Sequence, residues 1–249
     1  MTSTLDTLNT LIKARELLSE EGAWTDGELL EYKDDGTKCM CALGAVGVAA
    51  GFESEMELGK YDVFDDRSER VDPTAYAAVL ALLKPLDARY TKRYTSVFMY
   101  NDRFDDAGPV LEWFDKVIED VRNQLALETL TEAKRLIIEK GWGKTELIAD
   151  NGCMCALGGI ASAATGISTK QELLALTKGT YGIFSRDNEF SDEAAIVAAE
   201  AFRSVLTWEE VPYPDHSFTD VYRFNDTQPS EGAVLVVFDR AIANLTKEN

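Results

Sequence analysis

The string Cys39-Met-Cys-Ala-Leu-Gly44 occurs a second time in this chain, as Cys153-Met-Cys-Ala-Leu-Gly158. The residues on either side of the two strings also correspond. Two diverged copies form a small alignment inside one sequence, and this alignment shows which residues were retained after the duplication. We therefore interpret the chain as two tandem repeats, the first over residues 1–124 and the second over residues 125–249.

Helical periodicity and helix-ending glycines are shared by the two repeats. Each repeat opens with apolar residues at helical spacing, and Gly22 or Gly141 ends that segment. Residues 42–50 and 156–164 are rich in glycine and alanine, which suits a helix whose backbone lies close against a neighbouring segment. The turn at residues 35–36, Asp-Gly, allows a short β-hairpin before the first of these helices.

Further helix starts follow in both repeats. Asp72-Pro73 and Ser191-Asp192-Glu193 are typical of a helix N-terminus, because aspartate caps the first turn and proline fits the first helical position. They introduce helices that we expect near residues 75–83 and 194–206. No linker separates the repeats, so the last helix of the first repeat is expected to continue into the first helix of the second.

Together these features predict a mainly α-helical fold. The two tandem helical repeats would be related by a pseudo-twofold axis, with room for a short β-hairpin in each. Length differences between the repeats fall between the shared motifs, and one insertion lies around residues 208–215. Since loops tolerate insertions better than helices do, the shared motifs should lie on the common fold.

The charge of the chain excludes several classes of partner. It has 44 acidic and 25 basic residues and a formal net charge of -19. Such a chain repels phosphate backbones and anionic lipids, so we expect neither direct nucleic-acid binding nor membrane binding. The start of the chain does not resemble a secretory signal, and the longest apolar stretch is far shorter than the roughly 20 residues that cross a bilayer. We expect a cytoplasmic protein with reduced thiols.

The paired cysteines allow three interpretations. Four converging thiolates would have the right ligand number for zinc, although Cys-x-Cys is tighter than the usual spacing; the candidate ligands are Cys39, Cys41, Cys153 and Cys155. One cysteine could instead be a nucleophile at a helix N-terminus, where the dipole favours the thiolate. The sole histidine, His216, belongs to one repeat and could not serve both. We favour the third interpretation, in which small apolar cysteines pack at a crowded helix start.

Several other polar and aromatic residues are retained in the same order in each repeat. If they converge, each repeat holds one small polar pocket; the candidate ligand-binding residues are Trp24, Cys41, Asn101, Asp102, Trp142, Cys155, Asn225 and Asp226. The two Asn-Asp pairs precede a predicted helix, where such residues commonly close turns and cap backbone N–H groups. A tryptophan that follows a helix end more often closes a core than binds a ligand. No catalytic residue is assigned.

The order of these motifs resembles an uncharacterised family of small proteins in actinobacteria and their phages. The first repeat carries the resemblance through Gly22-Ala-Trp24, Cys41-Ala-Leu-Gly44-Ala45 and Asn101-Asp102 before a closing helix. The members look like one copy of the unit, so this chain resembles a tandem duplication. The family carries no activity that could be transferred. The resemblance implies only a setting, that of a cytoplasmic accessory protein encoded by a phage.

The second repeat resembles the same pattern with two departures. Its matching motifs are Gly141-Trp142, Cys155-Ala-Leu-Gly158 and Asn225-Asp226, whereas Gly159 replaces the alanine and Thr145 stands where the first repeat has Gly27. The cysteine of the pattern matches Cys41 or Cys155. Cys39 and Cys153 therefore look like additions, which weakens the case for an ancestral metal site.

From charge, duplication and the lack of a catalytic signature, we expect a non-enzymatic acidic accessory protein that binds a host or phage protein, in particular a basic one. Two other classes stay open. A small-ligand-binding protein or an enzyme would use one polar pocket per repeat, and a metal-binding protein would use the four cysteines. No cofactor is expected.

Overall fold

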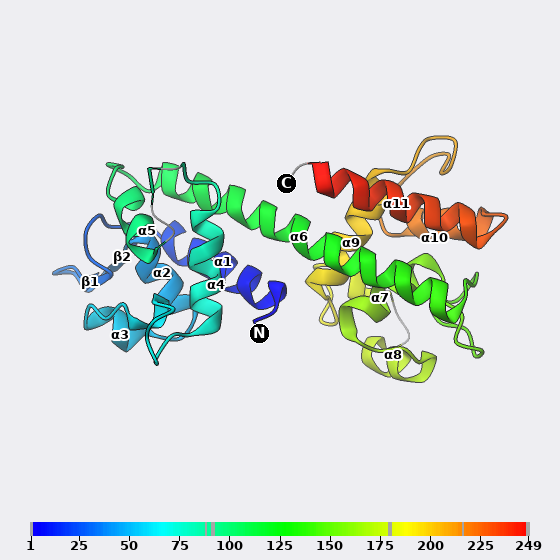
Figure 1. Cartoon of the computed structure of the whole chain (residues 1–249), viewed down its shortest axis with the longest axis horizontal. Coiled ribbons are helices and arrows are strands. Elements are labelled where there is room, and N and C mark those ends of the chain that lie inside the picture. The colour runs from blue at the N-terminus through cyan, green and yellow to red at the C-terminus, as the bar shows by residue number, and fades with distance from the viewer. Residues whose placement is uncertain (1, 88, 91–92, 179–180, 216, 248–249) are drawn as a thin grey trace. The chain divides into compact units, whose positions relative to one another are not determined.

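The chain folds into two compact units that divide between Val121 and Arg122. The computed structural model describes residues 2–87, 89–90, 93–178, 181–215 and 217–247, and the structure is mainly helical (Figure 1). The 33-residue helix α6 (Gly108–Lys140) contributes residues to both units. This confirms the prediction that the last helix of one repeat continues into the first helix of the next.

The remaining elements follow the same order in each unit. The first unit contains α1 (Thr4–Ser19), β1 (Leu30–Tyr32), β2 (Lys38–Met40), α2 (Ala42–Ala49), α3 (Glu53–Glu57), the 3-10 helix η1 (Asp62–Phe64), α4 (Pro73–Leu83) and α5 (Tyr94–Asn101). The second contains α7 (Ala156–Thr165), α8 (Lys170–Thr177), η2 (Gly182–Phe184), α9 (Glu193–Ser204), α10 (Thr219–Thr227) and α11 (Glu231–Lys247).

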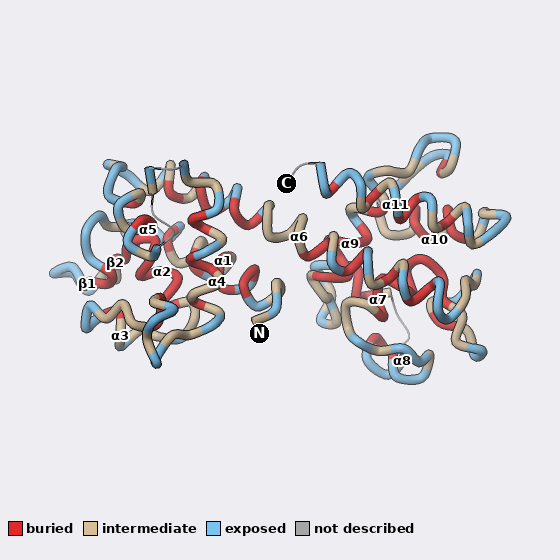
Figure 2. Tube along the Cα trace, in the orientation of Figure 1, coloured by how far each residue is buried: buried red, intermediate tan, exposed pale blue. Residues whose placement is uncertain are grey.

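Helices α2 and α7 form the centre of their units. Residues 42–48 of α2 and 156–162 of α7 are all buried, as Figure 2 shows in red. In the first unit α2 packs against α1, α3, α4 and α5, and in the second unit α7 packs against α9 and α10. A Cβ atom added at Gly44 would overlap the carbonyl oxygen of Leu29, and one at Gly158 would overlap that of Leu147. The predicted close backbone approach is therefore confirmed, and it explains the glycine at the end of the repeated string.

The β-hairpin differs between the units. In the first unit β1 and β2 pair antiparallel, with Leu30 opposite Met40, and Asp35 Oδ1 accepts the Thr37 N–H in the turn at 2.8 Å. In the described part of the second unit the equivalent pair, Ile148 and Met154, forms an isolated bridge. The segment between the paired positions is four residues shorter in the second repeat. It is therefore too short to form two strands with a turn of the same length between them.

The predicted caps of α4 and α9 are confirmed. Asp72 accepts hydrogen bonds from the first turn of α4, and Asp192 accepts one from the Ala195 N–H at 3.0 Å. Helices α5 and α10 were not predicted. The Asn-Asp pairs lie at the C-terminal ends of these helices, one short connection before α6 and α11. Helices of 8 and 9 residues give a weak sequence signal, because helical spacing is recognised over longer windows.

Candidate functional site

The amide side chain of Asn101 connects three segments of the first unit. Its Oδ1 accepts hydrogen bonds from the indole Nε1 of Trp24 and from the backbone N–H of Ala42, both at 3.0 Å. Its Nδ2 donates to the carbonyl oxygen of Thr25 at 3.1 Å and to Oδ1 of Asp102 at 3.2 Å. An amide offers two acceptor positions and two N–H groups, so all four are used. Because Asn101 is 0% exposed, its amide is committed to the fold.

The second unit repeats this network bond for bond. Asn225 Oδ1 accepts from Trp142 Nε1 at 2.8 Å and from the Ala156 N–H at 3.0 Å. Its Nδ2 donates to the Gly143 carbonyl and to Asp226 Oδ1, both at 3.1 Å. Each asparagine thus ties the tryptophan loop to the first turn of the central helix of its unit.

Asp102 and Asp226 hold the backbone of the same loop. Asp102 Oδ1 accepts the N–H of Gly27 at 3.1 Å, and Asp226 Oδ1 accepts that of Thr145 at 3.0 Å. Gly27 has a φ of 97° and Thr145 a φ of 67°, in the left-handed region that favours glycine. The carboxylate therefore fixes a turn that is strained in the second unit, where threonine replaces glycine.

Cys41 and Cys155 are the N-cap residues of α2 and α7. Their Sγ atoms accept the backbone N–H of Gly44 at 3.5 Å and of Gly158 at 3.3 Å. Burial raises the pKa of both thiols to about 12, and this effect outweighs the backbone N–H groups that favour the thiolate. The alternative interpretation, a cysteine nucleophile activated at the helix N-terminus, gains no support at these two positions, because desolvation is the largest effect on their pKa. Both are neutral at pH 7, as a packing role requires.

The other two cysteines have separate surroundings. Cys39 Sγ donates to the Thr37 carbonyl and Cys153 Sγ to the Lys140 carbonyl, each at 3.6 Å. All four cysteines are free thiols. Among the residues that the structure describes, no three histidine, cysteine, aspartate or glutamate side chains gather as metal ligands would. His216 lies outside the described residues.

The two indoles are anchored alike but have different neighbours. Trp24 and Trp142 are both half-buried. Lys144 Nζ lies 5.1 Å from the centroid of the Trp142 ring, a cation–π contact. In the first repeat the position of Lys144 is taken by Asp26. The shared part of the arrangement is therefore the hydrogen bond of the indole and not the charge beside its ring.

The retained candidates of each unit lie close together: the tryptophan, asparagine and aspartate share one hydrogen-bond network, and the cysteine is the N-cap of the helix that this network reaches. In the first unit these are Trp24, Cys41, Asn101 and Asp102, and in the second Trp142, Cys155, Asn225 and Asp226. The asparagines and cysteines are buried and engaged with neighbouring backbone, which assigns them a structural role. Ligand binding by these residues stays a prediction.

Sequence reasoning missed the tyrosine beside each network. Burial raises the pKa of Tyr61, and the charge of Glu28 acts in the same direction; burial and the charge of Glu146 do the same for Tyr181 in the second unit. Tyr61 also stacks on Tyr94, with ring centroids 5.5 Å apart. The available signal was a Gly-x-Tyr motif that both repeats contain, Gly59-x-Tyr61 in the first and Gly179-x-Tyr181 in the second.

Fold and site define a mainly α-helical protein made of two copies of one unit, each held by a Trp-Asn-Asp network. The profile of the Family of unknown function (DUF6197) matches residues 2–120 and again residues 121–244, so the chain belongs to this family and carries it twice. Neither a curated protein nor a solved structure matches the chain. In the described residues, no helix combines the length and apolarity that a membrane span requires.

Proposed function

We propose that this protein is a non-enzymatic, acidic accessory protein that binds a basic protein partner through the loop at residues 207–215. The proposal places it in the cytoplasm of an actinobacterial host, encoded by a phage, and this setting rests on the family resemblance of the two repeats. The partner belongs to the host or to the phage, and proteins that normally bind nucleic acid fit its charge.

Two exposed aromatic rings at the loop carry the proposal. Trp208 is 62% exposed and Tyr213 is 81% exposed, and their ring centroids lie 5.4 Å apart in an edge-on arrangement. Tryptophan and tyrosine dominate the binding energy of protein interfaces. Tyr213 also has a φ of 60°, which is costly for a bulky side chain and is typical of functional positions.

Hydrogen bonds of Glu210 and the buried side chain of Val211 anchor the loop that carries these rings. Glu210 accepts two hydrogen bonds from Arg240 of α11, at 2.7 and 2.8 Å, and one from the Thr207 N–H at 2.8 Å. Val211 is buried. A loop that such contacts fix in place loses less conformational entropy on association, which supports its use as a binding surface.

Charge supports a basic partner. Glu209 is exposed beside Trp208, and the whole chain carries a net charge of -19. Such a surface attracts basic proteins and accelerates their association at low salt. The insertion is specific to the second repeat, so the partner would bind one unit only.

The contacts of the retained residues support a structural role for them and not a catalytic one. Asn101 and Asn225 have no free donor or acceptor, and the thiols of Cys41 and Cys155 are neutral and buried. A catalytic side chain must reach its substrate. The alternatives of one polar ligand pocket per repeat and of a four-cysteine metal site gain no support from these contacts.

Affinity capture from an actinobacterial lysate tests the proposal, with the full chain as bait. The wild-type bait should retain basic proteins that elute as salt rises. Trp208→Ala should weaken this retention roughly 30-fold, the effect of losing an interface hot spot of about 2 kcal/mol. Leu58→Ala is the matched control, since Leu58 is an exposed apolar residue of the first unit, and it should retain the same proteins. Equal retention by the Trp208→Ala bait would refute the proposal.

A further inference from the structure

A hollow lies at the same place in each unit. It is bounded by the end of the 3-10 helix (η1 or η2), by the helix that follows (α4 or α9), and by the residues at the start of α5 or just before α10. In the second unit it measures about 270 Å³, and the residues that line it include Phe184, Arg186, Glu200, Arg203 and Phe218. In the first unit it measures about 210 Å³ and is lined by the equivalent segments. Both volumes lie below the roughly 300–1,000 Å³ of pockets for drug-sized ligands, so each hollow has room only for a smaller molecule.

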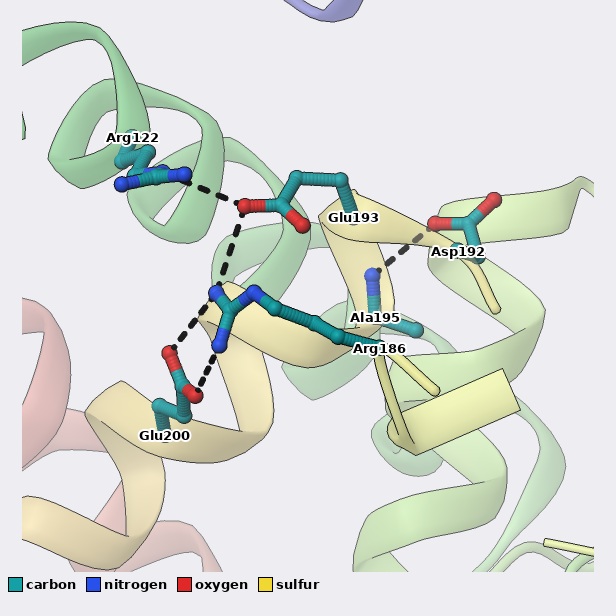
Figure 3. A network of polar contacts seen from close by, with 6 residues as sticks. All are labelled: Arg122, Arg186, Asp192, Glu193, Ala195 and Glu200. Atoms are coloured by element: carbon teal, nitrogen blue, oxygen red, sulfur yellow. Dashed lines mark hydrogen bonds and ion pairs between the residues drawn. The ribbon is translucent and has the colours of Figure 1, made fainter. Parts of the chain in front are cut away.

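Two residues that line the second hollow, Arg186 and Glu200, belong to the ion-pair network drawn in Figure 3. Arg186 donates to both carboxylate oxygens of Glu200, at 2.6 and 3.2 Å, and to Glu193 at 3.2 Å. Glu193 also accepts from Arg122 Nε at 3.1 Å. Two guanidinium groups thus face two carboxylates, so this network is neutral by itself.

Arg203 adds a positive charge that this network does not compensate. It lines the same hollow from α9, and its Nη1 is buried with no hydrogen-bond partner among the described residues. A buried cationic donor without an acceptor is unfavourable, and such groups normally pair with an anion. A buried guanidinium nitrogen without an acceptor is unusual in a chain with a net charge of -19, in which carboxylates are abundant.

The first unit provides an internal comparison. Its hollow contains Arg67 and Arg93 together with Asp65 and Asp66, so positive and negative charges balance. Arg67 is paired with Asp65 at 2.6 Å. In the first repeat the position equivalent to Arg203 is occupied by Leu83, the last residue of α4. Only the second hollow carries an excess positive charge.

We propose that the hollow of the second unit binds a small organic oxyanion, with its carboxylate or phosphate on Arg203. A guanidinium group recognises both anions through paired hydrogen bonds. Phe184 and Phe218, whose ring centroids lie 5.8 Å apart, provide an apolar wall for the body of the ligand. The residues that line this site do not include residues 207–215 of the loop proposed to bind a protein partner.

Isothermal titration calorimetry of the full chain tests this site, with benzoate and inorganic phosphate as probes and neutral benzamide as the control ligand. One equivalent of benzoate or phosphate should bind per chain, and benzamide should not bind. Arg203→Leu installs the residue of the first unit and should weaken binding about tenfold to hundredfold. Arg203→Lys, which keeps the charge and loses the planar fork, should bind with intermediate affinity.

Arg93→Ser in the first unit is the matched control, since serine occupies the equivalent position in the second hollow. It should leave the affinity unchanged. The proposal is overturned if neither anion binds, if two equivalents bind per chain, or if Arg203→Leu binds as tightly as the wild type while remaining folded by circular dichroism.

Discussion

The indole N–H of Trp24 donates to the buried side-chain oxygen of Asn101 across 77 residues of sequence, at 3.0 Å. The same bond joins Trp142 to Asn225 at 2.8 Å. Two copies that diverged in charge, loop length and hairpin structure have kept this bond. It therefore marks what the unit needs in order to fold, and function is better sought where the copies differ.

Replacing Asn101 by alanine should destabilise the first unit by about 3 kcal/mol. The substitution leaves the Trp24 indole and the Ala42 N–H buried without an acceptor, and each such loss is costly. Asn225→Ala should have a similar effect on the second unit. Urea denaturation measures both, and Met99→Ala, at an exposed position on α5, is the control that should change stability by less than about 0.5 kcal/mol. If Met99→Ala destabilises the protein as much as Asn101→Ala does, the structural role assigned to Asn101 is contradicted.

Gly44→Ala and Gly158→Ala should each cost about 4 kcal/mol or more, or prevent folding of their unit. The added methyl group would collide with the carbonyl oxygen of Leu29 or Leu147, and backbone cannot yield as a flexible side chain does. Gly232→Ala near the start of α11 is the control, because a Cβ there meets only Ser230 Oγ at 3.8 Å. Thermal unfolding that leaves Gly44→Ala close to the wild type would disprove the close approach.

Thr145→Gly should stabilise the second unit by up to about 1 kcal/mol. Threonine at a φ of 67° is strained, and glycine relieves that strain at some cost in unfolded-state entropy. The reverse change in the first unit, Gly27→Thr, should be destabilising because Gly27 has a φ of 97°. Chemical denaturation of both variants tests the sign of each effect, and a loss of stability in Thr145→Gly would contradict it.

The buried thiols predict a loss of stability at alkaline pH. The pKa of Cys41 and of Cys155 rises from 9.0 to about 12 on folding, so the folded state holds both protons more tightly. Their contribution is complete below about pH 9 and is lost as the pH rises toward 12. Between about pH 8.5 and pH 10 the wild type should lose about 1 kcal/mol per thiol more than a Cys41→Ser, Cys155→Ser variant. If urea denaturation shows the same pH dependence of stability for the wild type and for the variant, the prediction is contradicted.

The sequence was sufficient for the duplication, the helical class and the caps at Asp72 and Asp192. These features depend on local spacing, which a single chain displays. Helices α5 and α10 were missed because they are only 8 and 9 residues long, which is shorter than the window over which helical spacing can be recognised. The convergence of Trp24 with Asn101 was only a hypothesis, because a hydrogen bond between distant residues leaves no local pattern.

The hollow around Arg203 was beyond sequence reasoning for a similar reason. Its charge imbalance depends on which carboxylates reach Arg186 and Arg122, and no spacing rule predicts that pairing. The loop that carries Trp208 was recognised only as an insertion. Its exposure and the strained Tyr213 are properties of the folded chain.

The most direct test of the functional proposal compares the wild type with a Trp208→Ala, Tyr213→Ala double variant. Both substituted side chains are largely exposed, so the double variant should unfold within about 1 kcal/mol of the wild type. The same preparations are then used to measure salt-sensitive capture of basic proteins from an actinobacterial lysate. The account predicts unchanged stability with capture lost, whereas unchanged stability with undiminished capture would contradict it.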